Sequence, residues 1–145
     1  MDRASILDHN RVILCHFDSY STAMHFARYG DSVLMPSPLP EDAGADTAPV
    51  VIGEQHTPAA VMDAMIARYG FDPGQLIHAD GFEEWMTCSA GAIRIHLARF
   101  TSFDVPRVAI EPHGGVFKPI SEMRGMPMIE LNLMRQVFNQ IMGGG

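Results

Sequence analysis

Residues 57–71 carry the pattern that most constrains the fold, because their start, apolar face and end all indicate one amphipathic helix. Thr57 can accept hydrogen bonds from the free N–H groups of a first turn, and Pro58 fits that turn, where its missing N–H is harmless. Gly70 can adopt the left-handed conformation that ends a helix. Apolar residues recur between these signals at the spacing of one helix face, at Val61, Met62, Met65, Ile66 and Tyr69.

Short apolar runs on both sides of this helix predict a β-sheet. Residues 11–16 and 50–52 are dense in branched apolar side chains, and β-like runs recur at 105–110 and 116–120. Further apolar runs lie at 23–29, 32–35, 75–79 and 82–86. The longest strand is expected over 92–103, where Ile93, Ile95 and Leu97 alternate with Arg94, His96 and Ala98. This alternation is typical of a half-buried strand.

A second helix is predicted over 128–142. Glu130 lies in its first turn, Gly143 follows its end, and one apolar stripe contains Leu131, Met134, Phe138 and Ile141. Strands, a helix, several strands and a helix follow one another along the chain. This order predicts an α/β or α+β fold, with a mixed β-sheet packed between helices. We expect a single domain over 1–145, with an exposed Pro-rich acidic loop at 36–48.

Composition excludes several classes of protein. The 145 residues are 47% apolar, which argues against disorder, and their two cysteines argue against a disulfide scaffold. No apolar stretch approaches the roughly 18–20 residues of a membrane span. A net charge of −7 disfavours binding to a nucleic acid polymer or an anionic membrane surface. We therefore expect a soluble, cytoplasmic protein.

The order of elements resembles the Nudix fold, an α/β/α sandwich. In that family the helix ends in the pattern Arg-Glu-apolar-x-Glu-Glu-x-Gly-apolar, and residues 70–71 and Met65 fit its apolar frame. The acidic positions do not fit, because the Arg-Glu pair falls on Asp63 and Ala64, and the Glu-Glu pair on Ala67 and Arg68. The resemblance therefore implies a degenerate Nudix motif.

Nudix hydrolysis needs carboxylates that hold divalent cations, and the motif here does not support such a cofactor. The resemblance thus implies a non-catalytic domain that binds a small anionic or nucleotide-like ligand, or that pairs with itself as a homodimer. Guanidinium groups can hold a phosphate while an aromatic ring stacks on a base. The predicted ligand-binding residues are Arg94, Arg99, Phe100, Glu83 and Glu84.

Two alternatives come from other classes. In the first, a divergent metal-dependent hydrolase uses displaced carboxylates, at Glu54, Glu83 and Glu84, and His78 and His96 are candidate metal ligands. A thiol nucleophile at Cys88 lacks the cationic neighbour that would activate it. In the second alternative, the chain is a structural dimerisation module, and some of its eleven methionines form an apolar interface. The catalytic residues, if any exist, are not defined by the sequence.

Overall fold

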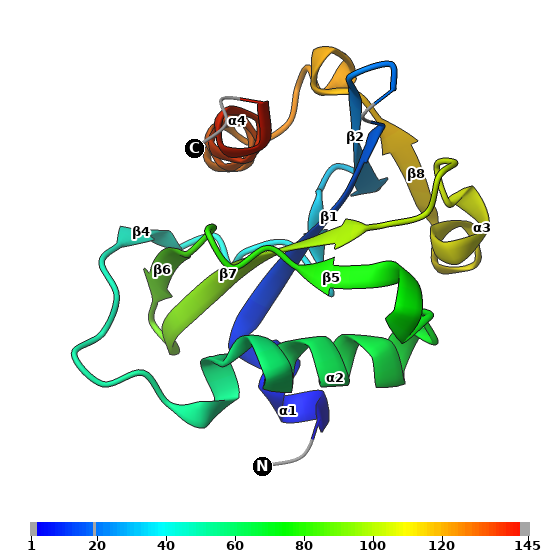
Figure 1. Cartoon of the computed structure of the whole chain (residues 1–145). Helices are drawn as coiled ribbons and strands as arrows, with labels where there is room; N and C mark the ends of the chain where they lie inside the picture. Colours follow the sequence, from blue (N-terminus) through cyan, green and yellow to red (C-terminus); the bar gives the residue numbers. More distant parts are fainter. Residues whose placement is uncertain (1–2, 19, 143–145) are drawn as a thin grey trace.

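One mixed β-sheet forms the centre of the computed structural model, which describes residues 3–18 and 20–142 (Figure 1). Its strands are β1 (Asn10–Asp18), β2 (Ala23–Tyr29), β3 (Leu34–Met35), β4 (Gly44–Asp46), β5 (Leu76–His78), β6 (Glu84–Cys88), β7 (Gly91–Phe100) and β8 (Gly115–Lys118). The main order is β4-β6-β7-β1-β2-β8, with β3 added to β1 and β5 added to β7. Among these pairings only β1 and β7 run parallel, with Asn10 opposite Arg94 and His16 opposite Phe100.

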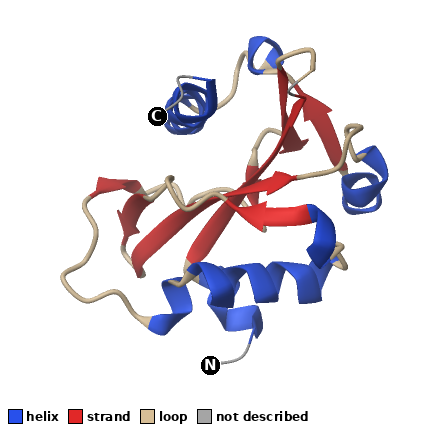
Figure 2. Cartoon of the chain, in the orientation of Figure 1, coloured by secondary structure: helices blue, strands red, loops and turns tan. Residues whose placement is uncertain are grey.

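Helices cover both faces of this sheet. They are α1 (Arg3–Asp8), α2 (Pro58–Tyr69), α3 (Arg107–Ile110) and α4 (Met128–Met142). In Figure 2, α1 and α2 lie together on one side of the sheet and α4 lies on the other. The buried apolar residues accordingly form two clusters, one containing Val61 and Met65 of α2 and the other containing Leu133 and Met134 of α4. The predicted class, a mixed sheet packed between helices, is confirmed.

Both ends of α2 follow the predicted local chemistry. The Thr57 hydroxyl accepts a hydrogen bond from the Ala60 N–H at 3.3 Å, and Pro58 occupies the first turn. Gly70 ends the helix in the left-handed conformation, with φ 71°, and its N–H donates to the Ile66 carbonyl at 2.8 Å. These contacts satisfy backbone groups that the helix itself leaves unpaired.

Strand β7 is buried on both faces, so the prediction of a half-buried strand is wrong. Ile93, Ile95 and Leu97 pack with the α4 cluster, as the alternation predicts. The opposite face is also covered, and its Arg94 and His96 are buried. Residues on α1, α2 and the turn before α2 enclose that face, and backbone carbonyls of this turn accept hydrogen bonds from Asn10 and Arg94 where the sequence indicates contact with water.

Two predicted strands are absent from the described structure. Val50 and Val51 are exposed at 104% and 81%, and residues 50–52 lie in a loop. Residues 107–110 form α3 instead of a strand, with Pro106 at its start. In this short helix the side chain of Val108 is exposed, whereas the side chain of Ile110 is fully buried against the edge of the sheet. Short apolar runs do not separate these structures, because only contacts with distant segments select one of them.

The remaining differences concern surface boundaries. The loop at 36–48 is largely exposed, and it also contributes β4, whose three residues pair with β6. In α4 the buried residues are Glu130, Leu133, Met134 and Val137, so the predicted stripe is displaced and Phe138 is 37% exposed. No helix in the described part of the chain is both long and apolar enough to cross a bilayer.

Candidate functional site

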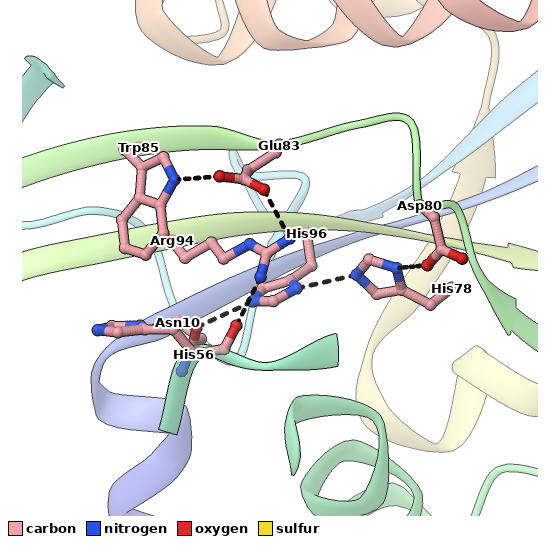
Figure 3. Close-up of polar contacts among 8 residues, drawn as sticks. All are labelled: Asn10, His56, His78, Asp80, Glu83, Trp85, Arg94 and His96. Atoms are coloured by element: carbon pink, nitrogen blue, oxygen red, sulfur yellow. Dashed lines mark hydrogen bonds and ion pairs between the residues drawn. The ribbon is translucent and has the colours of Figure 1, made fainter. Parts of the chain in front are cut away.

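A chain of polar side chains runs between the sheet and α2, and it contains both predicted metal-ligand candidates (Figure 3). Asn10 begins β1, His96 lies on the neighbouring strand β7, and His78 ends β5 on the far side of β7. His56 belongs to the short 3-10 helix η1 (Glu54–His56) before α2. Asn10, His56 and His96 are each at most 5% exposed. Four separate segments therefore bring one buried polar group together.

Asn10 is the centre of this group. Its Nδ2 atom donates to the carbonyl oxygens of Ile6 and Gln55, both at 2.8 Å, so its Oδ1 atom is free to accept. Oδ1 lies 2.9 Å from His96 Nε2 and 3.2 Å from His56 Nδ1. Since Oδ1 only accepts, both ring nitrogens carry protons. A single amide thus fixes the tautomer of His96 and joins β1, β7 and η1.

His96 is held in its neutral form. Burial lowers the pKa of this imidazole to about 2, and the positive charge of Arg94 acts in the same direction. With Nε2 protonated and the ring neutral, His96 Nδ1 is an acceptor, and it lies 2.9 Å from His78 Nε2. On its other side, His78 Nδ1 lies 3.0 Å from Asp80 Oδ1. The chain of contacts therefore runs from buried Asn10 to the exposed Asp80 carboxylate.

Arg94 and Glu83 lie beside this chain and are bound to each other. Arg94 Nη1 donates to the His56 carbonyl at 2.8 Å, and Nη2 lies 3.4 Å from Glu83 Oε1. The Arg94 guanidinium lies over the Trp85 ring, 5.9 Å from its centroid, and Trp85 Nε1 donates to Glu83 Oε2 at 2.9 Å. The guanidinium and the carboxylate thus satisfy groups of the protein itself, although both were predicted ligand contacts.

A separate pocket of about 420 Å³ lies beyond the carboxyl ends of the parallel strands β1 and β7. It is lined by Phe17, Asp18, Tyr20, Ile77, Arg99, Phe100, Thr101, Ser102 and Phe103. His16 Nε2 donates to the Ser102 carbonyl at 2.8 Å and so attaches the segment after β7 to β1. Parallel strands place their carboxyl ends at one edge of a sheet, where ligands of α/β proteins commonly bind.

Arg99 is the cation of this pocket. The structure gives its guanidinium no hydrogen bond or ion pair within residues 3–18 and 20–142, and its Nε atom is buried without a partner. The neighbouring Cys15 thiol supplies no negative charge to Arg99, because burial raises the pKa of the thiol to about 12 and keeps it neutral. Asp18, at the rim, accepts hydrogen bonds from the Tyr20 N–H at 2.9 Å and from the Ser21 hydroxyl at 3.0 Å. These bonds lower the pKa of the Asp18 carboxyl.

The predicted ligand-binding residues are thus divided between places. Arg99 and Phe100 line the pocket, whereas Arg94 and Glu83 belong to the polar group on the α2 face. Glu84 faces neither site. It pairs with Ile95 across β6 and β7, so its side chain lies on the α4 face of the sheet, whereas its neighbour Trp85 lies on the α2 face with Arg94. Two of the five residues therefore line one pocket, and their role in binding a ligand stays a prediction.

The described residues contain no group of three or more His, Cys, Asp or Glu side chains arranged to hold a metal ion. His78 and His96 direct nitrogens at each other, and Glu54 is exposed in η1. The displaced carboxylates of the hydrolase alternative therefore have no ligand set in the part of the chain that is described.

Sequence reasoning missed Asn10, Asp80 and the pocket residues Phe17 and Tyr20. No local spacing marks them, because Asn10 and Phe17 lie at opposite ends of β1, and Tyr20 and Asp80 lie in the turns that follow β1 and β5. Comparison with known proteins adds no further constraint, since no protein-family model and no curated protein matches the chain.

Proposed function

We propose that this protein is a Nudix-like domain that binds a small anionic, nucleotide-like ligand in the pocket beyond β1 and β7, without hydrolysing it. The observation that carries this proposal is the Arg99 guanidinium, which lines a 420 Å³ pocket and forms no ion pair with a described residue, the Asp18 carboxylate at the rim included. A guanidinium presents several N–H donors in one plane, and it binds phosphate or carboxylate in a bidentate manner.

Aromatic side chains in the pocket indicate a second property of the expected ligand, a planar ring. Phe17, Tyr20 and Phe103 line the same pocket, and Tyr20 and Phe103 are 91% and 82% exposed. Large exposed rings beside a cation favour a ligand with an anionic group and a planar ring, because each part then has a matching surface. The volume is within the range of about 300–1,000 Å³ that is usual for small-molecule sites.

The composition of α2 supports binding without hydrolysis. Asp63 is the sole carboxylate among the residues of α2, and its first turn holds no acid. A helix with one carboxylate cannot supply the several oxygen ligands by which a divalent cation is fixed for phosphate chemistry. A Nudix-like domain with this helix would retain the fold and lack the reaction.

Isothermal titration tests the proposal directly. ADP-ribose, ADP, AMP and inorganic phosphate are titrated into the protein, each with and without Mg²⁺, and the products are checked for released phosphate or AMP. We expect heat of binding for a nucleotide or ADP-ribose, no turnover, and at least a tenfold loss of affinity in Arg99→Ala. Arg135→Ala, at an exposed position of α4, is the matched control. Absence of binding across the whole panel would contradict the proposal.

Self-association is the second candidate function, and exposed apolar side chains at the same edge favour it. Tyr20, Phe103 and Val108 are each more than 80% exposed, at 91%, 82% and 81%. Two copies that bury these side chains would remove apolar surface from water. Light scattering across a dilution series measures this association, and Phe103→Ser should weaken it. A monomer at every concentration would count against it.

A further inference from the structure

The turn between β5 and β6, residues 79–83, connects the polar group on the α2 face to helix α4. At its start, the Ala79 N–H donates to the Leu97 carbonyl at 2.8 Å, and the Asp80 carboxylate reaches His78. With its amide turned to satisfy both of its atoms, Gln140 of α4 donates to the Gly81 carbonyl at 3.1 Å and accepts from the Phe82 N–H at 3.3 Å. The turn therefore contacts His78 of the polar group on one side and α4 on the other.

The protons along the chain of contacts can be counted from its buried end. Asn10 Oδ1 accepts from His96 Nε2, so the neutral His96 ring has no proton on Nδ1. The 2.9 Å contact between His96 Nδ1 and His78 Nε2 therefore needs its proton on His78. The reverse arrangement would place two acceptors, Asn10 Oδ1 and His96 Nε2, against each other.

The outer contact needs a second proton on the same ring. Asp80 Oδ1, 3.0 Å from His78 Nδ1, is an acceptor when ionised. A neutral imidazole has a single N–H, and the inner contact with His96 already uses it. A neutral His78 would therefore direct a lone pair at the Asp80 carboxylate, and Asp80, whose side chain is 88% exposed, is free to turn toward water.

The charged and titratable groups around His78 are few. Asp80, on its own connecting turn, favours the protonated ring, whereas burial and Arg94 on β7 oppose it. Burial is the largest of these effects, so the pKa of His78 lies below its usual value of 6.5. His96 on β7 and His56 on η1 are neutral neighbours whose own pKa values are also lowered by burial. Glu83 is paired with Arg94.

We propose that residues 79–82 form a pH-responsive latch, in which Asp80 closes onto His78 when both ring nitrogens of His78 are protonated and opens when only Nε2 is. The closed turn is held at three points, namely Leu97, His78 and Gln140. The open turn keeps its contacts with Leu97 and Gln140 and loses the one with His78. Acid therefore tightens the connection between the polar group and α4.

Two substitutions at the exposed Asp80 position separate the states without disturbing the core. In Asp80→Asn, the amide can donate to the unprotonated Nδ1 of a neutral His78, so the turn should stay closed at all pH values. In Asp80→Ala, no group remains to close it. Amide hydrogen exchange of residues 80–82, expressed as protection factors, is compared for both variants and the natural sequence at pH 7.5 and at a series of lower pH values.

At pH 7.5 we expect greater protection in Asp80→Asn than in Asp80→Ala, by up to about tenfold, the size of one half-exposed polar contact. The natural sequence should resemble Asp80→Ala at pH 7.5 and should approach Asp80→Asn as the pH falls through the range in which His78 gains its second ring proton. Nitrogen NMR of labelled histidine should show His78 protonated on Nε2 alone at pH 7.5. Equal protection in the two variants, or a His78 proton on Nδ1 at pH 7.5, would overturn the latch.

Discussion

At the scale of single residues, Asn10 shows how much one buried amide can determine. Its two donors are used by the backbone of α1 and of the turn before α2, and its oxygen accepts from two histidines. Each of these groups would otherwise be buried without a partner, at a cost of about 1–3 kcal/mol. The contact with Asn10 sets which nitrogen of His96 carries the proton, while burial and the charge of Arg94 keep the ring neutral.

We predict that the free energy of unfolding falls as the pH is lowered from 7.5 to 5. The pKa of His96 is about 2 in the folded protein and near 6.5 in the unfolded chain, so the unfolded chain binds the additional proton. Below pH 6.5, His96 should cost about 1.4 kcal/mol per pH unit. Denaturant unfolding at several pH values measures this slope.

His96→Gln provides the comparison for that prediction. Its slope between pH 6.5 and pH 5 should be smaller than that of the natural sequence, because one buried neutral histidine is removed. Glu130 acts in the opposite sense, since burial raises its pKa, and it is unchanged in both proteins. Identical slopes in the two proteins would show that His96 is not held neutral.

At the scale of secondary-structure elements, α2 is defined by its ends. The Thr57 side chain caps the helix, and the face of α2 that contains Val61, Ala64 and Met65 is buried against the sheet. Burial of that face fixes the position of the helix, whereas the cap fixes its first residue. His56 directly precedes the capping residue Thr57, so the polar group adjoins the first turn of α2.

Thr57→Ala should lower the free energy of unfolding by about 1 kcal/mol, because the Ala60 N–H loses its acceptor. Thr47→Ala, at an exposed position in the loop before α2, is the matched control and should change stability little. Denaturant unfolding measures both variants. A loss in Thr57→Ala no larger than in Thr47→Ala would show that the cap contributes nothing.

At the scale of the whole molecule, the parallel pair β1 and β7 separates two kinds of polar site. Asn10 and Arg94, at one end of the register, are enclosed between the sheet and α2. The other end of the two strands opens into the pocket that Arg99 lines. At the first site Arg94 is bound to Glu83 and to the His56 carbonyl, whereas at the second the Arg99 guanidinium forms no hydrogen bond or ion pair with a described residue. Ligand binding is therefore expected to act at the second site.

A ligand that binds the folded protein alone should raise its melting temperature. At one hundred times its dissociation constant, such a ligand stabilises the fold by about 2.7 kcal/mol. For a domain of this size the shift is roughly 5–10 °C. Thermal unfolding with the tightest nucleotide of the titration panel measures it. Arg99→Ala should lose the shift and Arg135→Ala should keep it, and an equal shift in both would place the ligand elsewhere.

The sequence by itself determined what depends on neighbouring residues. Thr57, Pro58 and Gly70 define the limits of α2 because caps and a left-handed end are local structures. Alternation in β7 likewise predicted which side chains share a face, since successive residues of a strand point to opposite sides. The class of fold followed from the order of these elements.

The tertiary structure alone decided what depends on distant segments. It buried Arg94 and His96 under α2, made 107–110 a helix, and left 50–52 as a loop. It also joined Asn10 to His96 and placed Arg99 among the aromatic residues of the pocket. A hydrogen bond between residues 86 positions apart has no signal in local spacing, because it depends on the register of two strands.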